Sequence, residues 1–340
     1  MLLVKNFNKD SSMSLPYDNG CILLGNDYNN KKMIINAIIK YFSGKKLNQE
    51  EHEYLDGNDI EIYINDRKVQ SKEYIPIIIS PEIDISNEIQ LSKSSFSRRI
   101  LSKLLKKVLE YDPKLEFIND LIEELLQSEY SKDVNDFFDL LNNNEENNEI
   151  KIGYEIEKLT LVDFLDTLLK MKIYKGNSIL PVNYTSYIDS LRIYIKIIDY
   201  MINYIEESKR FIIICDHLEN KLNDIETKEI YSEVKRLQLN SRVDVIIVSS
   251  NGKNISISAG NIETVSILNK NKQLKIYDIE HLLKEVEINY YKDIQPYQLE
   301  DGIYDVIKNH SDLICKKNKD ENYYNISRME EEIIKILDEY

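Results

Sequence analysis

The chain has 340 residues, of which 42% are hydrophobic and 30% are charged, and its formal net charge is −15. Because the apolar residues fall in periodic runs that can bury a core, this composition excludes wholesale disorder. A negative mean field repels phosphate, so binding to nucleic acid would require basic residues that are segregated into patches.

The sequence favours a reduced, cytoplasmic protein with no membrane partner. The first ten residues, MLLVKNFNKD, lack the basic and apolar regions of a signal peptide. No apolar run approaches the about 18 residues that span a bilayer. The three cysteines, Cys21, Cys215 and Cys315, are widely spaced without partner motifs, and we expect buried thiols where they lie inside apolar runs.

The first predicted elements are a strand, a polar loop and a helix in succession. The run CILLG at 21–25 predicts a buried strand, and residues 26–30 form a polar loop. Apolar residues at helical spacing predict a helix over 31–42, which Gly44 ends.

An alternating segment follows. The sequence IEIYI at 60–64 predicts a second strand, which stops at the turn signal Asn65-Asp66. We expect its partner strand within 68–79. Pro76 cannot donate a ladder hydrogen bond, so that strand should lie at a sheet edge.

The middle of the chain, 92–204, is rich in predicted helices. They span 94–111, 115–127, 133–141, 161–171 and 186–205. The stretch NNNEENN at 142–148 is typical of a polar linker or loop tip.

Strand character returns in the last third. Predicted strands span 211–215, 243–248 and 262–268, with a helix over 228–239. The tail from 276 is mixed and charged, and its last predicted helix spans 329–340.

Strands that alternate with helices indicate a mostly parallel sheet with crossover helices. The sequence therefore predicts an α/β fold in which the helical middle interrupts the sheet. We predict an α/β domain of 1–90 and 206–275, a helical domain of 91–205 inserted in it, and a C-terminal extension of 276–340.

The segment GNDYNNKK at 25–32 has part of a phosphate-binding loop. A working loop follows a strand, opens a helix and reads G-x-x-x-x-G-K-[ST], where the last residue binds Mg²⁺. Gly25 and Lys31 stand at the required spacing. Asn30 replaces the second glycine and Lys32 replaces the hydroxyl, so the α/β domain is predicted to be a degenerate P-loop NTPase-like head.

The remaining nucleotide-site residues are also incomplete. Asp216 stands in the place of the aspartate that helps to hold Mg²⁺, but His217 follows it instead of a carboxylate that could orient water. Asp27 adds negative charge where phosphate would lie. We therefore predict a degenerate nucleotide site of Gly25, Lys31 and Asp216, and no enzymatic activity.

Three blocks of this sequence resemble the accessory spacer-adaptation protein of type II-A CRISPR systems, in its long, Csn2-like form. They agree with that family in order and spacing more than in identity. The blocks are LPYDNGCILLGNDYNNKKMIINAIIKYF, FINDLIEELLQSEYSKDVNDFFDLL and KRFIIICDHLENKLNDIETKEIYSEVKRLQLNSRVDVIIVSS.

The resemblance implies a head with an altered nucleotide-binding fold and a helical leg. It also implies a homotetrameric ring that threads the ends of double-stranded DNA through a basic hole and that calcium stabilises. Family members are non-enzymatic, and the implied partners are the CRISPR integrase complex and the effector nuclease of the same system.

Basic residues are segregated in two regions, against the acidic trend of the chain. Residues 93–108 hold six basic residues and no acidic one. The second region holds Lys31, Lys32 and Lys40, with Lys45 and Lys46 at the end of the predicted helix, where basic residues ordinarily complement the helix dipole. Contacts from such residues to phosphate give binding that tolerates any sequence. The predicted DNA-binding residues are Lys31, Lys32, Lys40, Arg98, Arg99, Lys103, Lys106 and Lys107.

One predicted helix carries carboxylates on a single side, where like charges repel. Calcium accepts several carboxylate oxygens and would relieve that repulsion. The candidate calcium ligands are Glu116, Asp120, Glu123, Glu124 and Glu129. A solvated helix face explains either charge pattern from sequence alone. Two other functions stay open: an active P-loop ATPase, and a structural scaffold protein without DNA contact.

Overall fold

The computed structural model describes residues 1–111, 114–126, 136, 160, 172–175, 177–204, 208–269, 272–276, 279–289, 296–314 and 326–339. The chain divides into two compact units. The first consists of Met1–Asp84 with Glu206–Tyr340, and the second of Ile85–Ile205. The tail from 276, predicted as a separate extension, belongs to the first unit.

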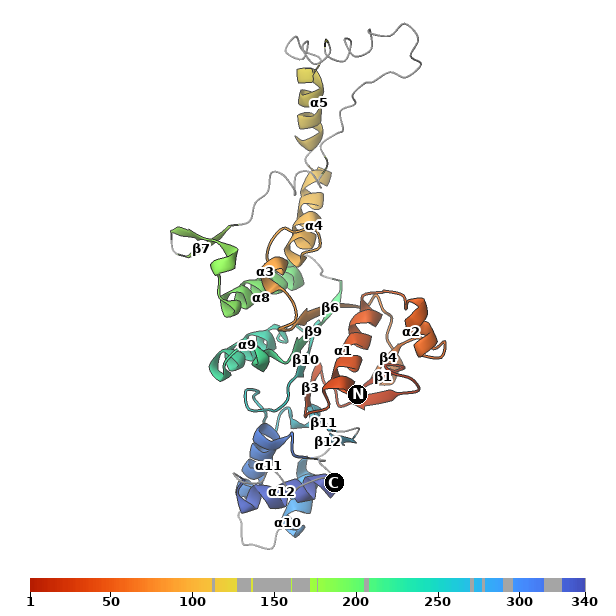
Figure 1. Ribbon diagram of the computed structural model, residues 1–340, viewed down its shortest axis with the longest axis vertical. Helices are drawn as coiled ribbons and strands as arrows, with labels where there is room; N and C mark the ends of the chain where they lie inside the picture. The colour runs from red at the N-terminus through yellow and green to blue at the C-terminus, as the bar shows by residue number, and fades with distance from the viewer. Residues whose placement is uncertain are drawn as a thin grey trace. The chain divides into compact units, whose positions relative to one another are not determined.

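A six-stranded sheet forms the centre of the first unit (Figure 1). Its spatial order is β12-β11-β3-β10-β9-β6, and neighbours pair in parallel except β12 with β11. The strands are β3 (Gly20–Leu24), β6 (Tyr74–Ile79), β9 (Arg210–Asp216), β10 (Val243–Val248), β11 (Val265–Asn269) and β12 (Lys272–Lys275). The predicted mostly parallel sheet, interrupted by the helical middle, is confirmed because β3 and β6 precede the second unit and the others follow it.

The edge position predicted from Pro76 is confirmed, since β6 is the last strand of the sheet. The predicted partner of 60–64 is correct only at its first residue, Lys68. The strand β4 (Glu61–Ile64) pairs with β5 (Arg67–Lys68), whereas β6 pairs with β9. The reason is the tight turn between β4 and β5, where two consecutive residues adopt positive φ and reverse the chain at once.

A second, antiparallel sheet has the order β2-β1-β4-β5. Its first two strands, β1 (Leu2–Lys5) and β2 (Ser12–Leu15), were not predicted. Each has only four residues, which is too short for an alternating pattern to stand out.

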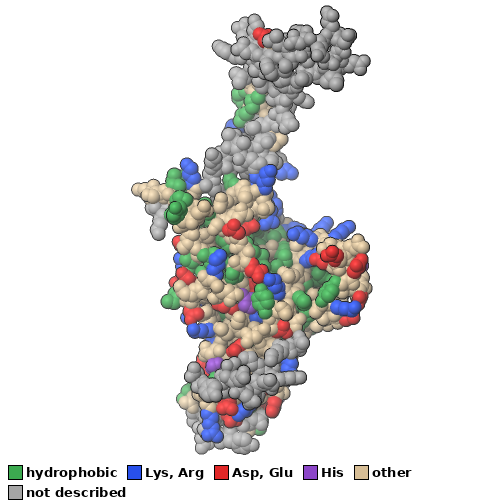
Figure 2. Space-filling model, in the orientation of Figure 1, with side chains coloured by type: hydrophobic (Ala, Val, Ile, Leu, Met, Phe, Trp, Pro, Cys, Tyr) green, Lys and Arg blue, Asp and Glu red, His purple; other side chains and the backbone are tan. Residues whose placement is uncertain are grey.

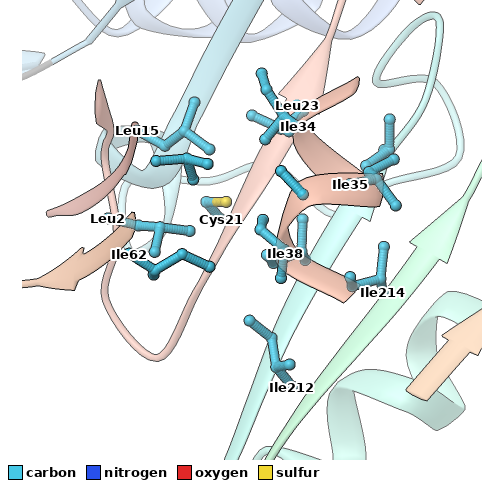
Figure 3. Close-up of a cluster of buried hydrophobic side chains, with 14 of the residues drawn as sticks. Leu2, Leu15, Cys21, Leu23, Ile34, Ile35, Ile38, Ile62, Ile212 and Ile214 are labelled. Carbon is cyan, nitrogen blue, oxygen red and sulfur yellow. The ribbon is translucent and has the colours of Figure 1, made fainter. Parts of the chain in front are cut away.

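Helices cover both faces of the parallel sheet, which explains why its strands read as continuous apolar runs. The helices α1 (Tyr28–Phe42) and α9 (Asp224–Leu237) lie on opposite sides of it (Figure 1). Ile34 and Ile38 of α1 pack into a core with alternate strand residues such as Leu23 and Ile214 (Figure 3). The other helices of this unit are α2 (Gln49–Tyr54), α10 (Ile279–Asn289), α11 (Pro296–His310) and α12 (Arg328–Glu339).

The second unit is mainly helical in its described part. It contains α3 (Ile85–Glu88), α4 (Phe96–Tyr111), α5 (Lys114–Leu126), β7 (Ile173–Lys175), β8 (Ser178–Leu180) and α8 (Tyr187–Tyr204). The rings of Phe96 and Tyr194 join α4 to α8, with their centroids 5.2 Å apart. The predicted helices at 133–141 and 161–171 and the polar stretch 142–148 lie outside the described residues. Within the described residues, no helix combines the length and the apolarity that a bilayer crossing requires.

Candidate functional site

The loop between β3 and α1 lies at the carboxyl end of the parallel sheet, where open α/β sheets place their ligands. Gly25 begins it with φ +96°, a conformation that favours glycine. A Cβ at this position would lie 2.3 Å from the carbonyl oxygen of Leu268 on β11. The glycine is therefore required by close packing against a neighbouring strand.

Asp27 caps the first turn of α1 with its own carboxylate. Its Oδ1 accepts a hydrogen bond from the backbone N–H of Asn30 at 3.2 Å, and its Oδ2 accepts from the Asn30 side-chain amide at 2.8 Å. In a phosphate-binding loop, the amides at this helix N-terminus point at the phosphate. Here the Asp27 carboxylate takes the place of the phosphate, because it accepts the hydrogen bond from this helix N-terminus.

Lys31 is fully buried and points away from solvent. Its Nζ donates to the carbonyl oxygens of Gly25 at 2.6 Å and Ser249 at 2.9 Å, and it lies 3.0 Å from Nε2 of His217. An ammonium has three hydrogens, and these three acceptors use all of them. Lys31 therefore cannot contact a DNA phosphate in this structure, and its assignment to the DNA-binding set is corrected.

His217 links Lys31 to Asp216. Because the Lys31 ammonium donates to Nε2, the imidazole proton belongs on Nδ1, which lies 2.6 Å from Oδ1 of Asp216. Burial lowers the pKa of Lys31 to about 8, although the nearby carboxylates of Glu219, Asp216 and Asp27 act in the opposite direction. The structure thus brings Gly25, Lys31 and Asp216 together, as predicted, but as an internally bonded cluster.

Several residues of this cluster were missed from sequence. Oε1 of Glu219 accepts from the backbone N–H of Ser250 at 2.9 Å and lies 2.8 Å from the hydroxyl oxygen of Ser249. Asn269, the last residue of β11, accepts from the backbone N–H of Asn26 at 2.5 Å and donates to the carbonyl of Ser311 at 2.8 Å. In the sequence, Glu219 and Asn269 are only polar residues at or just beyond the end of a predicted strand. No motif marks either of them as part of a site.

Side chains from α1 and from the segment after β6 cover the outer side of this loop. Lys32 forms an ion pair with Glu82 at 2.9 Å, and the hydroxyl of Tyr28 donates to the same carboxylate at 3.1 Å. The ring of Tyr28 lies 5.3 Å from that of His217. Further along α1, Lys40 is bonded to Glu51. The two predicted DNA-binding lysines of this helix that reach the surface therefore already have acidic partners.

The basic residues of α4 separate into buried and exposed positions. Arg98 is buried within the second unit, with its guanidinium 3.5 Å from the carbonyl of Leu91, so a phosphate does not reach it and its assignment is corrected. Arg99, Lys103 and Lys106 are exposed and stand at i, i+4 and i+7, on one face of the helix. We call these three residues the α4 basic face. The side chain of Lys107 lies outside the described residues.

The predicted calcium ligands on α5 are exposed. This holds for Glu116, Asp120, Glu123 and Glu124, while Glu129 lies outside the described residues. Across the described part of the chain, no three His, Cys, Asp or Glu side chains are grouped as a metal site would need. Calcium binding stays a prediction.

Comparison with known proteins gives one informative result. No protein-family model matches the sequence, and no curated protein matches it. The structure is similar to the crystal structure of Stu0660 of Streptococcus thermophilus, with a TM-score of 0.75 and 18% sequence identity. The match covers 99% of this chain and 92% of that chain. The chain therefore has the fold of Stu0660 over nearly its whole length.

Proposed function

We propose that this chain is a non-catalytic protein of CRISPR adaptation. In this proposal it binds the ends of double-stranded DNA without sequence preference, as a homo-oligomeric ring, and acts with the integrase complex and the effector nuclease. Stu0660 is a Csn2-like CRISPR-associated protein, and the fold shared with it supports the choice of system. The α4 basic face supports the choice of ligand.

The α4 basic face is the observation that carries DNA binding. Its residues lie on exposed positions of successive turns, over about 10 Å of helix axis. No acidic residue occurs between 93 and 108, so this segment is uniformly basic in a chain that is acidic as a whole. A row of cations that follows a helix holds phosphates and carries no base-specific information, which fits a protein that must accept any end.

The internal bonding of the loop after β3 supports a non-catalytic role. Transfer of a phosphoryl group requires a lysine and a metal-bound oxygen at the phosphates. Lys31 has its three hydrogens engaged within the chain, and Asp27 occupies the helix N-terminus. ATP hydrolysis above background by the purified protein, abolished by Lys31→Ala, would contradict this part of the proposal.

The test reverses the charge of the α4 basic face in the full chain. The triple variant Arg99→Glu, Lys103→Glu and Lys106→Glu is compared with a control that removes equal charge from exposed positions of the first unit. The control changes Lys228, Lys272 and Lys284 to Glu. Affinity for a fluorescent linear duplex is measured by anisotropy over a salt series.

We expect the α4 variant to bind at least tenfold more weakly than both wild type and control. Each lost phosphate contact should reduce the slope of log K against log salt by about 0.9. Equal loss in both triple variants would mean that only net charge matters and would overturn the assignment of this face. If wild type fails to bind linear duplex at low salt, with and without calcium, the scaffold alternative is favoured instead.

A further inference from the structure

A cavity of 350 Å³ lies beside the C-terminal end of α1 in the first unit. Its wall is formed by the end of α1, the loop 44–47, and the segments around β4 and β5. Figure 2 shows Lys and Arg side chains gathered at the upper edge of this part of the unit. The charged groups that line the cavity are Lys40, Lys45, Lys46, Lys68, Asp59 and Glu61.

Two of the four lysines have a partner that explains their position. Lys40 lies in the last turn of α1, where a cation complements the helix dipole, and it is bonded to Glu51. Lys68 on β5 is bonded to Glu61. Of the two carboxylates that line the cavity, Glu61 is therefore already engaged.

Lys45 and Lys46 have no such explanation. Both are exposed, and neither makes a hydrogen bond or ion pair with any residue of the described chain. They follow Gly44, whose φ of +66° turns the chain away from α1, so they lie beyond the turn over which the helix dipole acts. Asp59 is the one lining carboxylate left, and it cannot neutralise two ammonium groups.

We infer that this cavity binds a phosphate group, with Lys45 and Lys46 as its direct ligands. Lys40 and Lys68 line the cavity from two other segments, each paired with a carboxylate, so the lysines converge through the tertiary fold and not through one helix face. Lysine binds phosphate as a compact charge without strict geometry. With Lys40 and Lys68 paired, Lys45 and Lys46 outnumber Asp59 on the lining, so this concave surface is locally positive in a chain with a net charge of −15. The phosphate source is either a DNA backbone or free polyphosphate.

The first experiment titrates the full chain with tripolyphosphate by isothermal calorimetry. The variant is Lys45→Ala with Lys46→Ala, and the matched control is Lys228→Ala with Lys284→Ala, which removes the same charge elsewhere on the same unit. All four changes are at exposed positions, and a thermal midpoint within about 2 °C of wild type checks the fold of each variant.

We expect wild type and control to bind tripolyphosphate with the same affinity, and the Lys45/Lys46 variant to bind at least tenfold more weakly. Equal affinity in all three proteins would overturn the inference, as would the absence of binding to wild type at millimolar tripolyphosphate.

The second experiment identifies the source of the phosphate by competition with a labelled linear duplex. If the DNA backbone is the source, tripolyphosphate displaces duplex from wild type and the Lys45/Lys46 variant loses affinity for duplex. If the source is free polyphosphate, affinity for duplex is unchanged in that variant. The triple variant of the α4 basic face should retain full affinity for tripolyphosphate. A failure of the proposed DNA binding is thereby separated from a failure of the cavity.

Discussion

At the scale of single residues, the structure of the loop after β3 is set by the hydrogen-bond partners of two charged side chains. Asp27 satisfies the N-terminal turn of α1, and Lys31 turns inward to carbonyl groups at the ends of β3 and β10. The sequence predicted a degenerate site from Asn30 and Lys32, whose side chains differ from the functional pattern. The buried position of Lys31 has a measurable consequence, because a buried ammonium titrates at a lower pH than a solvated one.

We predict that the stability of wild type increases between pH 7 and about 9.5, relative to the variant Lys31→Met. The pKa of Lys31 is about 8 in the folded chain against an ordinary value of 10.5, so in this window the unfolded chain binds more protons and a rise in pH favours folding. The full difference corresponds to at most about 3 kcal/mol in the free energy of unfolding. Denaturant unfolding at a series of pH values measures it.

The control for this experiment is Lys32→Met. The pKa of Lys32 is raised by its bond to Glu82, so its loss should leave the pH dependence as in wild type. The range stops below pH 10 because burial raises the pKa of Tyr17, Tyr74 and Tyr231, and stability is lost once these groups ionise in the unfolded chain. Parallel curves for wild type and Lys31→Met would contradict the buried, titrating lysine.

At the scale of elements, the sequence predicted which face of a helix carries the charged side chains, but it did not predict which groups those side chains contact. Helical periodicity placed Arg99, Lys103 and Lys106 on one face of α4, and the structure confirms that all three are exposed. Periodicity did not identify Arg98 as buried, because the partner of its guanidinium is the carbonyl of Leu91, which lies outside the helix. On α5 the same periodicity placed four carboxylates at exposed positions.

The acidic side of α5 leads to a prediction about calcium. Millimolar calcium should raise the thermal unfolding midpoint of the full chain by about 3 °C or more, because carboxylates at i and i+4 repel by a few tenths of a kcal/mol per pair and a hard cation relieves this. Differential scanning fluorimetry with calcium and with magnesium measures the gain. The gain should vanish in the quadruple variant with Glu116→Gln, Asp120→Asn, Glu123→Gln and Glu124→Gln.

A matched control keeps this experiment specific. It replaces four exposed carboxylates of the first unit by amides, at Glu50, Glu263, Glu287 and Asp305. The control should keep the response of wild type to calcium. If both quadruple variants lose the response equally, calcium acts through net charge, and α5 is not its site.

At the scale of the whole molecule, the proposed function requires several copies of the chain. One chain offers only a few exposed cations against a net charge of −15, and repetition by rotational symmetry would bring those cations around one axis. The α4 basic face, and the cavity beside the end of α1 that Lys45 and Lys46 line, would then each occur once per subunit. Both surfaces belong to the described chain, so their contribution is testable without knowledge of the subunit contacts.

We predict that native mass spectrometry of the full chain gives four times the 40.1 kDa of one subunit. A closed ring must load from a free end, so the assembly should bind a linear duplex and should not bind the same DNA as a closed circle. A single cut of the circle should restore binding. A monomer at micromolar concentration, or equal binding to circle and cut circle, would contradict the ring.

The sequence by itself determined the elements whose signal is local. Continuous apolar runs predicted β9 and β10, the spacing of apolar residues predicted α1, and Pro76 predicted an edge strand, because burial and backbone geometry act on neighbouring residues along the chain. Only the tertiary structure decided which strand β6 joins, that Lys31 and Arg98 are buried, and that lysines from three segments line one cavity. These outcomes depend on groups that are far apart in sequence, such as Lys31 and Ser249, and the energy of burying a charge is set by partners that no local pattern specifies.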